Sequence, residues 1–357
     1  MEQHQDTMAM LDLITRPAFC VKDGVILRVN RAAEHMTIEA NRPVAQFLST
    51  GQTEYTEFDS GCLYLTLNLN GVEAGASVVS MNGYHVFIIE DENDQAELKA
   101  MALAAQTLRE PLSSVMTMAG SLLPAVENAN DPAAADQMAR LNRGLFQMLR
   151  ILGNMSDAER YRSDTMPRME TRNITALTDE LFGKLAVMAD HAGIELRFDN
   201  LQDSLFCLVD SEKLERAVYN IFSNAMKFTP KGGNIHAKLF RRENRLYLTV
   251  QDSGSGIPEN QRSSIYTRFL RHPGLDDNRQ GIGLGMVLIR SAATAHGGTV
   301  LIEQSKDTGL RLTMTMEIRQ NREGLVRSPG LRVDYAGEWD HSLIELSESL
   351  PASLYKK

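Results

Sequence analysis

The chain has 357 residues and a formal net charge of −9, which allows two or three domains and argues against a surface for nucleic acid or an anionic membrane. Cys20, Cys62 and Cys207 lie far apart and form no CxxC pair, so we expect a reducing compartment and no structural zinc. No stretch approaches the roughly 18 apolar residues of a membrane span, and the polar first residues lack the core of a signal peptide. These features predict a soluble, cytoplasmic protein.

Residues 8–92 mix short strands with short helices. Apolar runs at 18–21 and 25–29 flank Asp23-Gly24, a typical hairpin turn, and Asn30 is expected to cap a helix over 31–36. Further strands are predicted at 62–69, 76–79 and 85–89. This order is similar to that of a PAS sensory domain. His35, His85 and Cys20 are either cofactor contacts or ordinary surface and core residues, and both interpretations stay open.

Residues 93–162 are predicted to form two long helices that are interrupted at 127–132. Apolar residues on the second helix alternate at spacings of three and four, as in a coiled-coil seam: Met138, Leu141, Leu145, Met148, Leu152 and Met155. One helical hairpin has too little core by itself, whereas two make a four-helix bundle. We therefore expect a homodimer. The alternative is that the seam packs against the catalytic domain within one chain.

Two asparagines, Asn220 and Asn224, lie one helical turn apart and so share one face of a predicted helix. Carboxamide oxygens suit a hard cation such as Mg²⁺, which bridges phosphates. Further along, Asp252 is followed by Gly254 and Gly256. A buried carboxylate can accept a hydrogen bond from the amine of a purine, and glycines let the main chain approach the base.

A second glycine cluster, Gly281, Gly283 and Gly285, opens an apolar helix predicted over 282–295, whose first amides would face phosphate oxygens. Each motif alone has an ordinary explanation, namely exposed polar positions, a strand-ending turn or a flexible loop. Together and in this order, the motifs favour a nucleotide site.

The ordered motifs closely resemble those of the GHKL ATPase/kinase superfamily, in particular the catalytic domain of sensor histidine kinases. The resemblance covers residues 173–319 and includes Phe269 and His296-Gly297-Gly298. It implies ATP and Mg²⁺ as cofactors, with Asn224 as the metal ligand and Asn220 assisting. It also implies a lid over 270–280 and the following nucleotide contacts: Asn220, Asn224, Lys227, Phe228, Asp252, Gly254, Gly256, Ile257, Phe269, Gly281, Gly283, Leu284 and Gly285.

In this family the helical hairpin carries a phosphoacceptor motif close to His-Glu-Leu-Arg-Thr-Pro-Leu. Residues 106–112 read QTLREPL, so Gln106 stands where the histidine belongs, and Thr107 and Glu110 replace the other two functional residues. The lone pair of a carboxamide nitrogen is delocalised and is a poor nucleophile. No histidine lies between His85 and His191 to take its place.

The sequence therefore predicts an α+β multidomain protein. A PAS-like α/β domain (8–92) precedes an antiparallel helical hairpin (93–162), a Bergerat-type α/β sandwich that binds ATP (173–319) and a tail (320–357). A polar linker is expected over 156–171. The tail either docks on the catalytic domain or binds a partner.

The favoured function is a histidine-kinase-like signalling protein, or pseudokinase, that binds Mg-ATP without phosphorylating itself. It would work with a response regulator or another signalling protein. The alternative is an active kinase that uses a partner's histidine or an unusual acceptor such as Thr107, Ser113 or Ser114. An ATP-hydrolysing machine of the gyrase or heat-shock type ranks lower, because Asn220 replaces the glutamate base of those relatives.

Overall fold

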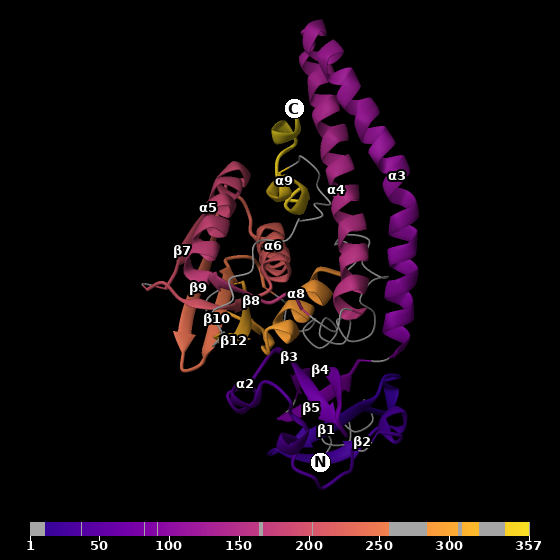
Figure 1. Ribbon diagram of the computed structural model, residues 1–357, viewed down its shortest axis with the longest axis vertical. Coiled ribbons are helices and arrows are strands. Elements are labelled where there is room, and N and C mark those ends of the chain that lie inside the picture. Colours follow the sequence, from indigo (N-terminus) through magenta and orange to yellow (C-terminus); the bar gives the residue numbers. More distant parts are fainter. Residues whose placement is uncertain are drawn as a thin grey trace.

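The computed structural model describes residues 11–36, 38–81, 83–90, 92–163, 167–201, 203–256, 284–305, 309–320 and 340–356. Within these ranges, two long helices stand beside an α/β region built on one large sheet (Figure 1). A mixed α/β architecture was expected, and the structure confirms it.

The N-terminal part contains strands at the predicted places. They are β1 (Ala18–Lys22), β2 (Val25–Val29), β3 (Cys62–Leu69), β4 (Val72–Met81) and β5 (Tyr84–Ile89), with η1 (Arg31–Ala33), η2 (Val44–Phe47) and α2 (Gln52–Thr56) between β2 and β3. Asp23 and Gly24 take positive φ angles of 50° and 76°, as the predicted tight hairpin requires. Asn30 caps as expected, with its Oδ1 accepting from Ala33 N at 3.1 Å, but the helix it opens is only the three-residue 3-10 helix η1. The same oxygen also accepts from Ala18 N of β1 at 2.9 Å.

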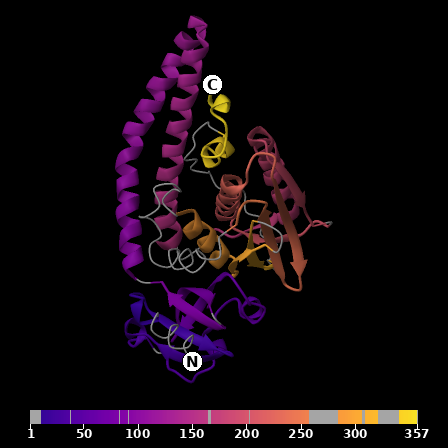
Figure 2. The ribbon, with the colours of Figure 1, turned by 180° about the vertical axis from the view of Figure 1, so that it is seen from behind.

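Helices α3 (Glu92–Ala129) and α4 (Pro132–Ser163) pack side by side, and we call them the helix pair (Figures 1 and 2). The chain breaks between them within the predicted interval. Helix α4 runs past residue 156, where a linker was expected, because Ala158 and Tyr161 are buried against helix α8. Across the described ranges, we find no helix that combines the length and apolarity needed to cross a membrane.

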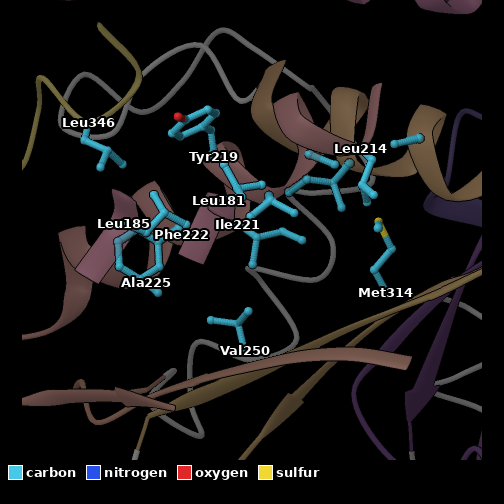
Figure 3. Close-up of a cluster of buried hydrophobic side chains, with 14 of the residues drawn as sticks. Leu181, Leu185, Leu214, Tyr219, Ile221, Phe222, Ala225, Val250, Met314 and Leu346 are labelled. Carbon is cyan, nitrogen blue, oxygen red and sulfur yellow. The ribbon is translucent and has the colours of Figure 1, made fainter. Parts of the chain in front are cut away.

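The remaining elements form a second α/β region. They are β6 (Glu170–Asn173), α5 (Ile174–Ala192), β7 (Glu195–Asp199), β8 (Phe206–Val209), α6 (Ser211–Phe228), β9 (Asn234–Arg242), β10 (Arg245–Asp252), α8 (Leu284–Ala295), β11 (Val300–Gln304) and β12 (Leu310–Glu317). The apolar core lies between the helices and the sheet. Figure 3 shows Ile221 and Phe222 of α6 above Val250 of β10, with Met314 of β12 in the same cluster.

One sheet runs through both α/β regions, in the order β2-β1-β5-β4-β3-β11-β12-β10-β9-β7. Strands β3 and β11 join the two halves in antiparallel register, with Leu301 opposite Leu63. The Leu301 side chain packs against the N-terminal core. The two halves were expected as separate units, and the junction between them carries no sequence signal.

The apolar seam predicted on α4 divides between two environments. Leu145 and Leu152 are buried within the protomer, whereas Leu141 and Met148 are exposed. Leu145 and Leu152 share an apolar cluster with Ala105 and Leu112 of α3. A C-terminal segment with α9 (His341–Glu345) and η3 (Ala352–Tyr355) also packs along α4, where it contacts Asn142, Arg143 and Phe146. Part of the seam therefore follows the alternative of packing within one chain, and only the rest remains available to a second copy.

Candidate nucleotide site

Helix α6 carries four of the predicted site residues, and its start is held by three hydrogen bonds. Asp210 caps the helix, since its Oδ1 accepts from Lys213 N at 3.1 Å and its Oδ2 accepts from Arg168 N at 2.9 Å. The buried His296 ring accepts from Asp210 N through Nε2 at 3.0 Å. Burial lowers the pKa of His296, in keeping with a neutral ring that accepts at this nitrogen. This histidine therefore positions the helix.

Asn220 has a side-chain oxygen that is ready for a ligand. The residue is 1% exposed, and its Nδ2 donates to Arg216 O at 2.8 Å. Its Oδ1 is buried and has no hydrogen-bond partner among the described residues. Asn224, one turn later, is half-buried. A buried oxygen without a partner is costly, and a hard cation such as Mg²⁺ would satisfy it.

Gly285, at the start of α8, lies directly against this oxygen. A methyl group at residue 285 would come within 2.7 Å of Asn220 Oδ1. The structure thus brings Gly285, the last glycine of the second cluster, to the asparagine helix. Leu284 faces away from this contact, since its side chain packs with Leu98 and Tyr161 of the helix pair.

Asp252 ends strand β10 beneath the same helix. Its Oδ1 accepts from Gly254 N at 2.9 Å and from Leu310 N at 3.3 Å, so the carboxylate is fixed in one orientation. Burial raises the pKa of Asp252, and the main-chain amides counteract this rise. Gly254 in turn lies so close to Phe228 that a methyl group there would be 2.5 Å from the Phe228 carbonyl oxygen. The carboxylate is available to accept from a base.

The end of α6 presents a cation and an aromatic ring. Lys227 Nζ lies 3.3 Å from Glu348 Oε2, and the Phe228 side chain is partly exposed. Gly256 packs against the side chain of Gln304, the last residue of β11. These close approaches link α6 to α8 through Asn220 and Gly285, and the end of β10 to α6 through Gly254 and to β11 through Gly256. Ile257, Phe269, Gly281, Gly283 and the predicted lid over 270–280 lie outside the described residues.

Several site neighbours were not found from the sequence. Gln304 and Gly309 contact Gly256 and Asp252, but nothing in their local sequence marks them. Arg216 places its guanidinium between α4 and the C-terminal segment, where it pairs with Asp157 at 2.8 Å and with Glu345. Such pairs join residues far apart in the chain, and no spacing rule detects them. His296 was noticed only as part of the His-Gly-Gly motif, without its role at Asp210.

The acceptor position lies on α3, in the helix pair. Gln106 and Thr107 are exposed there, and Thr107 Oγ1 donates to Ala104 O at 2.8 Å. Arg109, which aligns with the family's arginine, reaches across to Ser156 Oγ of α4 at 3.5 Å. Residues 106–112, which resemble the family's acceptor motif, therefore lie within one helix.

Comparison with known proteins gives the following similarities. A family model described as "Histidine kinase-, DNA gyrase B-, and HSP90-like ATPase" matches residues 209–320. Sensor histidine kinase TmoS of Ectopseudomonas mendocina is 30% identical over 221 residues, which cover 60% of this chain and 22% of that protein. Hybrid signal transduction histidine kinase D of Dictyostelium discoideum is 27% identical over 241 residues, covering 65% of this chain and 15% of that protein.

A solved structure, full-length ShkA in complex with AMPPNP, has 20% identity and a TM-score of 0.49, covering 62% of this chain and 46% of that chain. The regions matched in TmoS and in histidine kinase D each cover less than a quarter of the length of that protein.

Proposed function

Because the chain belongs to the sensor histidine kinase family and carries its GHKL-type ATP-binding domain, we propose that it is a cytoplasmic signalling protein that binds Mg-ATP without phosphorylating itself. The observation that carries this proposal is the contrast between its two sites. Among the described residues, Gly285 lies against Asn220 and Gly254 lies against Phe228, which supports a nucleotide site, whereas Gln106 stands at the position that resembles the acceptor. The three cysteines are free and buried, which suits a reducing compartment.

Binding of Mg-ATP is supported by the chemistry of the side chains. Asn220 Oδ1 and the neighbouring Asn224 would hold Mg²⁺, and Asp252 would accept a hydrogen bond from the adenine amine. Lys227 would lie along the phosphates, with Phe228 beside the nucleoside. When bound, Mg²⁺ would neutralise phosphate charge. Holding the nucleotide in place is then the work of these side chains and of the main chain at Gly254 and Gly285.

The lack of self-phosphorylation is supported by the chemistry of Gln106. A carboxamide has no basic nitrogen that could attack a phosphoryl group. Thr107 provides no carboxylate to orient or deprotonate a nucleophile, and its hydroxyl is already hydrogen-bonded to Ala104 O. The ATP-binding domain would then change conformation with the bound nucleotide and pass that change to its partners in a signalling complex.

An active kinase with an unusual acceptor is the second candidate. Thr107, Ser113 and Ser114 are hydroxyl residues exposed on α3 near the acceptor position, and this exposure favours them as acceptors. A histidine on a partner protein would serve equally. Both routes need only a positioned nucleotide and a nucleophile that reaches its γ-phosphate.

We also propose a homodimer formed through the helix pair, with a response regulator or another signalling protein as partner and the N-terminal region as a PAS-like sensor. Exposed apolar residues recur every seven positions on both helices: Leu108, Val115 and Leu122 on α3, and Leu141 and Met148 on α4. Val115→Asp should yield a monomer in light scattering. Thr117→Asp, which is equally exposed on α3 but lies off this stripe, should stay dimeric.

Labelling with γ-labelled ATP and Mg²⁺ tests the proposed function. We expect nucleotide binding and no label on the chain. Label that survives acid would point to a serine or threonine acceptor, and label that acid removes would point to a histidine. Either result would replace the proposal with an active kinase.

A further inference from the structure

The C-terminal residues 340–356, the last described stretch of the chain, lie between α4 and α6 (Figures 1 and 2). Four of their side chains are almost completely buried in the main core: Ile344, Leu346, Leu350 and Tyr355. Figure 3 shows Leu346 in the same cluster as Tyr219 of α6. The segment is packed as firmly as an internal element. From here on, the tail means residues 340–356, the described part of the predicted tail.

Polar residues on α4 bind the main chain of the tail. Arg143 donates to Ser347 O at 2.9 Å through Nε and to Glu348 O at 2.7 Å through Nη2. Asn142 Nδ2 donates to Tyr355 O at 3.0 Å. These donors satisfy carbonyl oxygens at the end of α9 and η3 that would otherwise need water. The helix pair therefore offers a specific docking surface, and the tail occupies it.

Two carboxylates of the tail join α4 to the helix of the nucleotide site. Glu345 is fully buried and pairs with Arg216 of α6, and its Oε2 lies 3.7 Å from Arg150 Nε on α4. Glu348 lies 3.3 Å from Arg150 Nη1 and 3.3 Å from Lys227 Nζ. Each acid thus bridges a cation of the helix pair and a cation of α6.

The ion pair between Lys227 and Glu348 affects how Lys227 can contact the phosphates of a bound nucleotide. An ammonium that holds a carboxylate cannot give the same contacts to a phosphate, and the carboxylate repels the phosphate charge. Both partners of the Lys227–Glu348 pair are partly exposed, so the pair is weak enough to exchange. ATP phosphates and Glu348 would therefore compete for Lys227.

We propose that the tail is an intramolecular clasp that holds the ATP-binding domain on α4 and that Mg-ATP loosens it by taking Lys227 from Glu348. The competition rests on the proposed function, since it requires that Lys227 meets the phosphates. By linkage, a clasp that ATP weakens must also weaken ATP binding. The tail then makes the contact between the helix pair and the ATP-binding domain depend on the nucleotide.

The first experiment needs no nucleotide. Arg143→Ala removes two hydrogen bonds to the tail, and we expect amide hydrogen exchange at Leu346 and Leu350 to rise about tenfold or more. Arg140→Ala is the matched control, because Arg140 is an exposed arginine on the same helix and forms an ion pair with Asp136, outside the tail. Exchange that is equally slow in both variants would overturn docking of the tail by α4.

The second experiment measures competition. Calorimetry should show that Glu348→Gln binds Mg-ATP about three- to fivefold more tightly than the wild type. This factor corresponds to the free energy of one partly exposed ion pair. Glu180→Gln, which removes an exposed pair with Lys184 on α5, should leave the affinity unchanged. Saturating Mg-ATP should also raise hydrogen exchange in the wild-type tail.

The outcomes separate the two proposals. If ATP binds with the same affinity to the wild type and Glu348→Gln, and the tail keeps its protection, the competitive clasp is wrong while the proposed function stands. If no variant binds ATP, the proposed function fails and the competition with it. The Arg143→Ala result then decides whether the tail is held by α4.

Discussion

Glu54 of α2 and Arg245 of β10 form an ion pair between the N-terminal region and the ATP-binding domain, with Glu54 Oε1 2.7 Å from Arg245 Nε. Glu54 is buried, and Arg245 also donates to Thr315 Oγ1 at 3.1 Å. The same two regions also meet where β3 pairs with β11 in the large sheet. Beside it, Gly51 packs against Thr299, the residue before β11. The two regions are therefore joined by both main-chain and charged contacts.

Glu54→Gln should loosen this junction. The substitution leaves the Arg245 guanidinium without its carboxylate, and breaking a largely buried pair costs roughly 1–3 kcal/mol. We expect faster hydrogen exchange at the amides of β11 that pair with β3. Glu57→Gln is the control, since it removes the neighbouring but exposed pair with Arg242 and should cost under about 1 kcal/mol. Equal exchange in the two variants would show that Glu54 does not hold the junction.

Gly285→Ala should prevent Mg-ATP binding while leaving the fold intact. The added methyl would lie 2.7 Å from Asn220 Oδ1 and would displace the oxygen assigned to Mg²⁺. Gly183→Ala on α5 is the control, because a methyl there meets nothing within 4 Å. It should stabilise the helix by up to about 1 kcal/mol and leave affinity unchanged. If calorimetry finds wild-type affinity for Mg-ATP in Gly285→Ala, Asn220 is not part of the nucleotide site.

Asp252→Ala should weaken ATP binding about tenfold to a hundredfold, since a lost partner for a buried donor costs about 1–3 kcal/mol. Asp199→Ala removes an exposed carboxylate of β7 in the same domain, where it pairs with His236, and should leave affinity unchanged. The comparison with GTP sharpens the test. A carboxylate that reads the adenine amine should discriminate ATP from GTP in the wild type, and Asp252→Ala should lose that discrimination.

The buried His296 predicts how stability depends on pH. Burial lowers its pKa in the folded chain, so the unfolded chain takes up the proton first as pH falls through about 6.5. The stability that the neutral ring contributes is complete above this pH and is lost below it, by at most about 1.4 kcal/mol per pH unit for one proton.

Urea unfolding at pH 7.5 and 5.5 measures this loss. His296→Gln keeps a side-chain acceptor for Asp210 N and should flatten the pH dependence, although His85, whose pKa burial also lowers, preserves part of it. His191→Gln, at an exposed position on α5, should behave as the wild type. If His296→Gln and the wild type lost the same stability between pH 7.5 and 5.5, the His296 ring would take up its proton in the folded chain as readily as in the unfolded chain.

Local patterns in the sequence predicted much of the fold. The Asp23-Gly24 turn, the alternation over Cys62–Leu69 and the break before Pro132 each depend on neighbouring residues, and the structure has each of them in place. The order of the nucleotide motifs also predicted that the helix after the second glycine cluster meets the asparagine helix, and Gly285 lies against Asn220. The assignment of ligands to these residues remains a prediction.

Long-range contacts were beyond this reasoning. The β3–β11 junction depends on the edges of two strands far apart in the chain, and neither edge carries a sequence signal. The seam on α4 illustrates the same limit. Its spacing correctly marks apolar positions, but Leu145 is buried within the protomer, in a cluster that includes residues of α3, whereas Met148 is exposed. Spacing identifies a buried face without identifying what buries it.

The central claim is that this chain binds Mg-ATP and lacks only a phosphoacceptor. The most direct test compares the wild type with Gln106→His/Thr107→Glu under γ-labelled ATP, after calorimetry has measured nucleotide binding in both. We predict that both bind Mg-ATP, that the wild type carries no acid-labile phosphate and that the double variant carries some. Strong acid-labile label on the wild type would contradict the claim. No label on the double variant, despite ATP binding, would show that the ATP-binding domain does not reach α3.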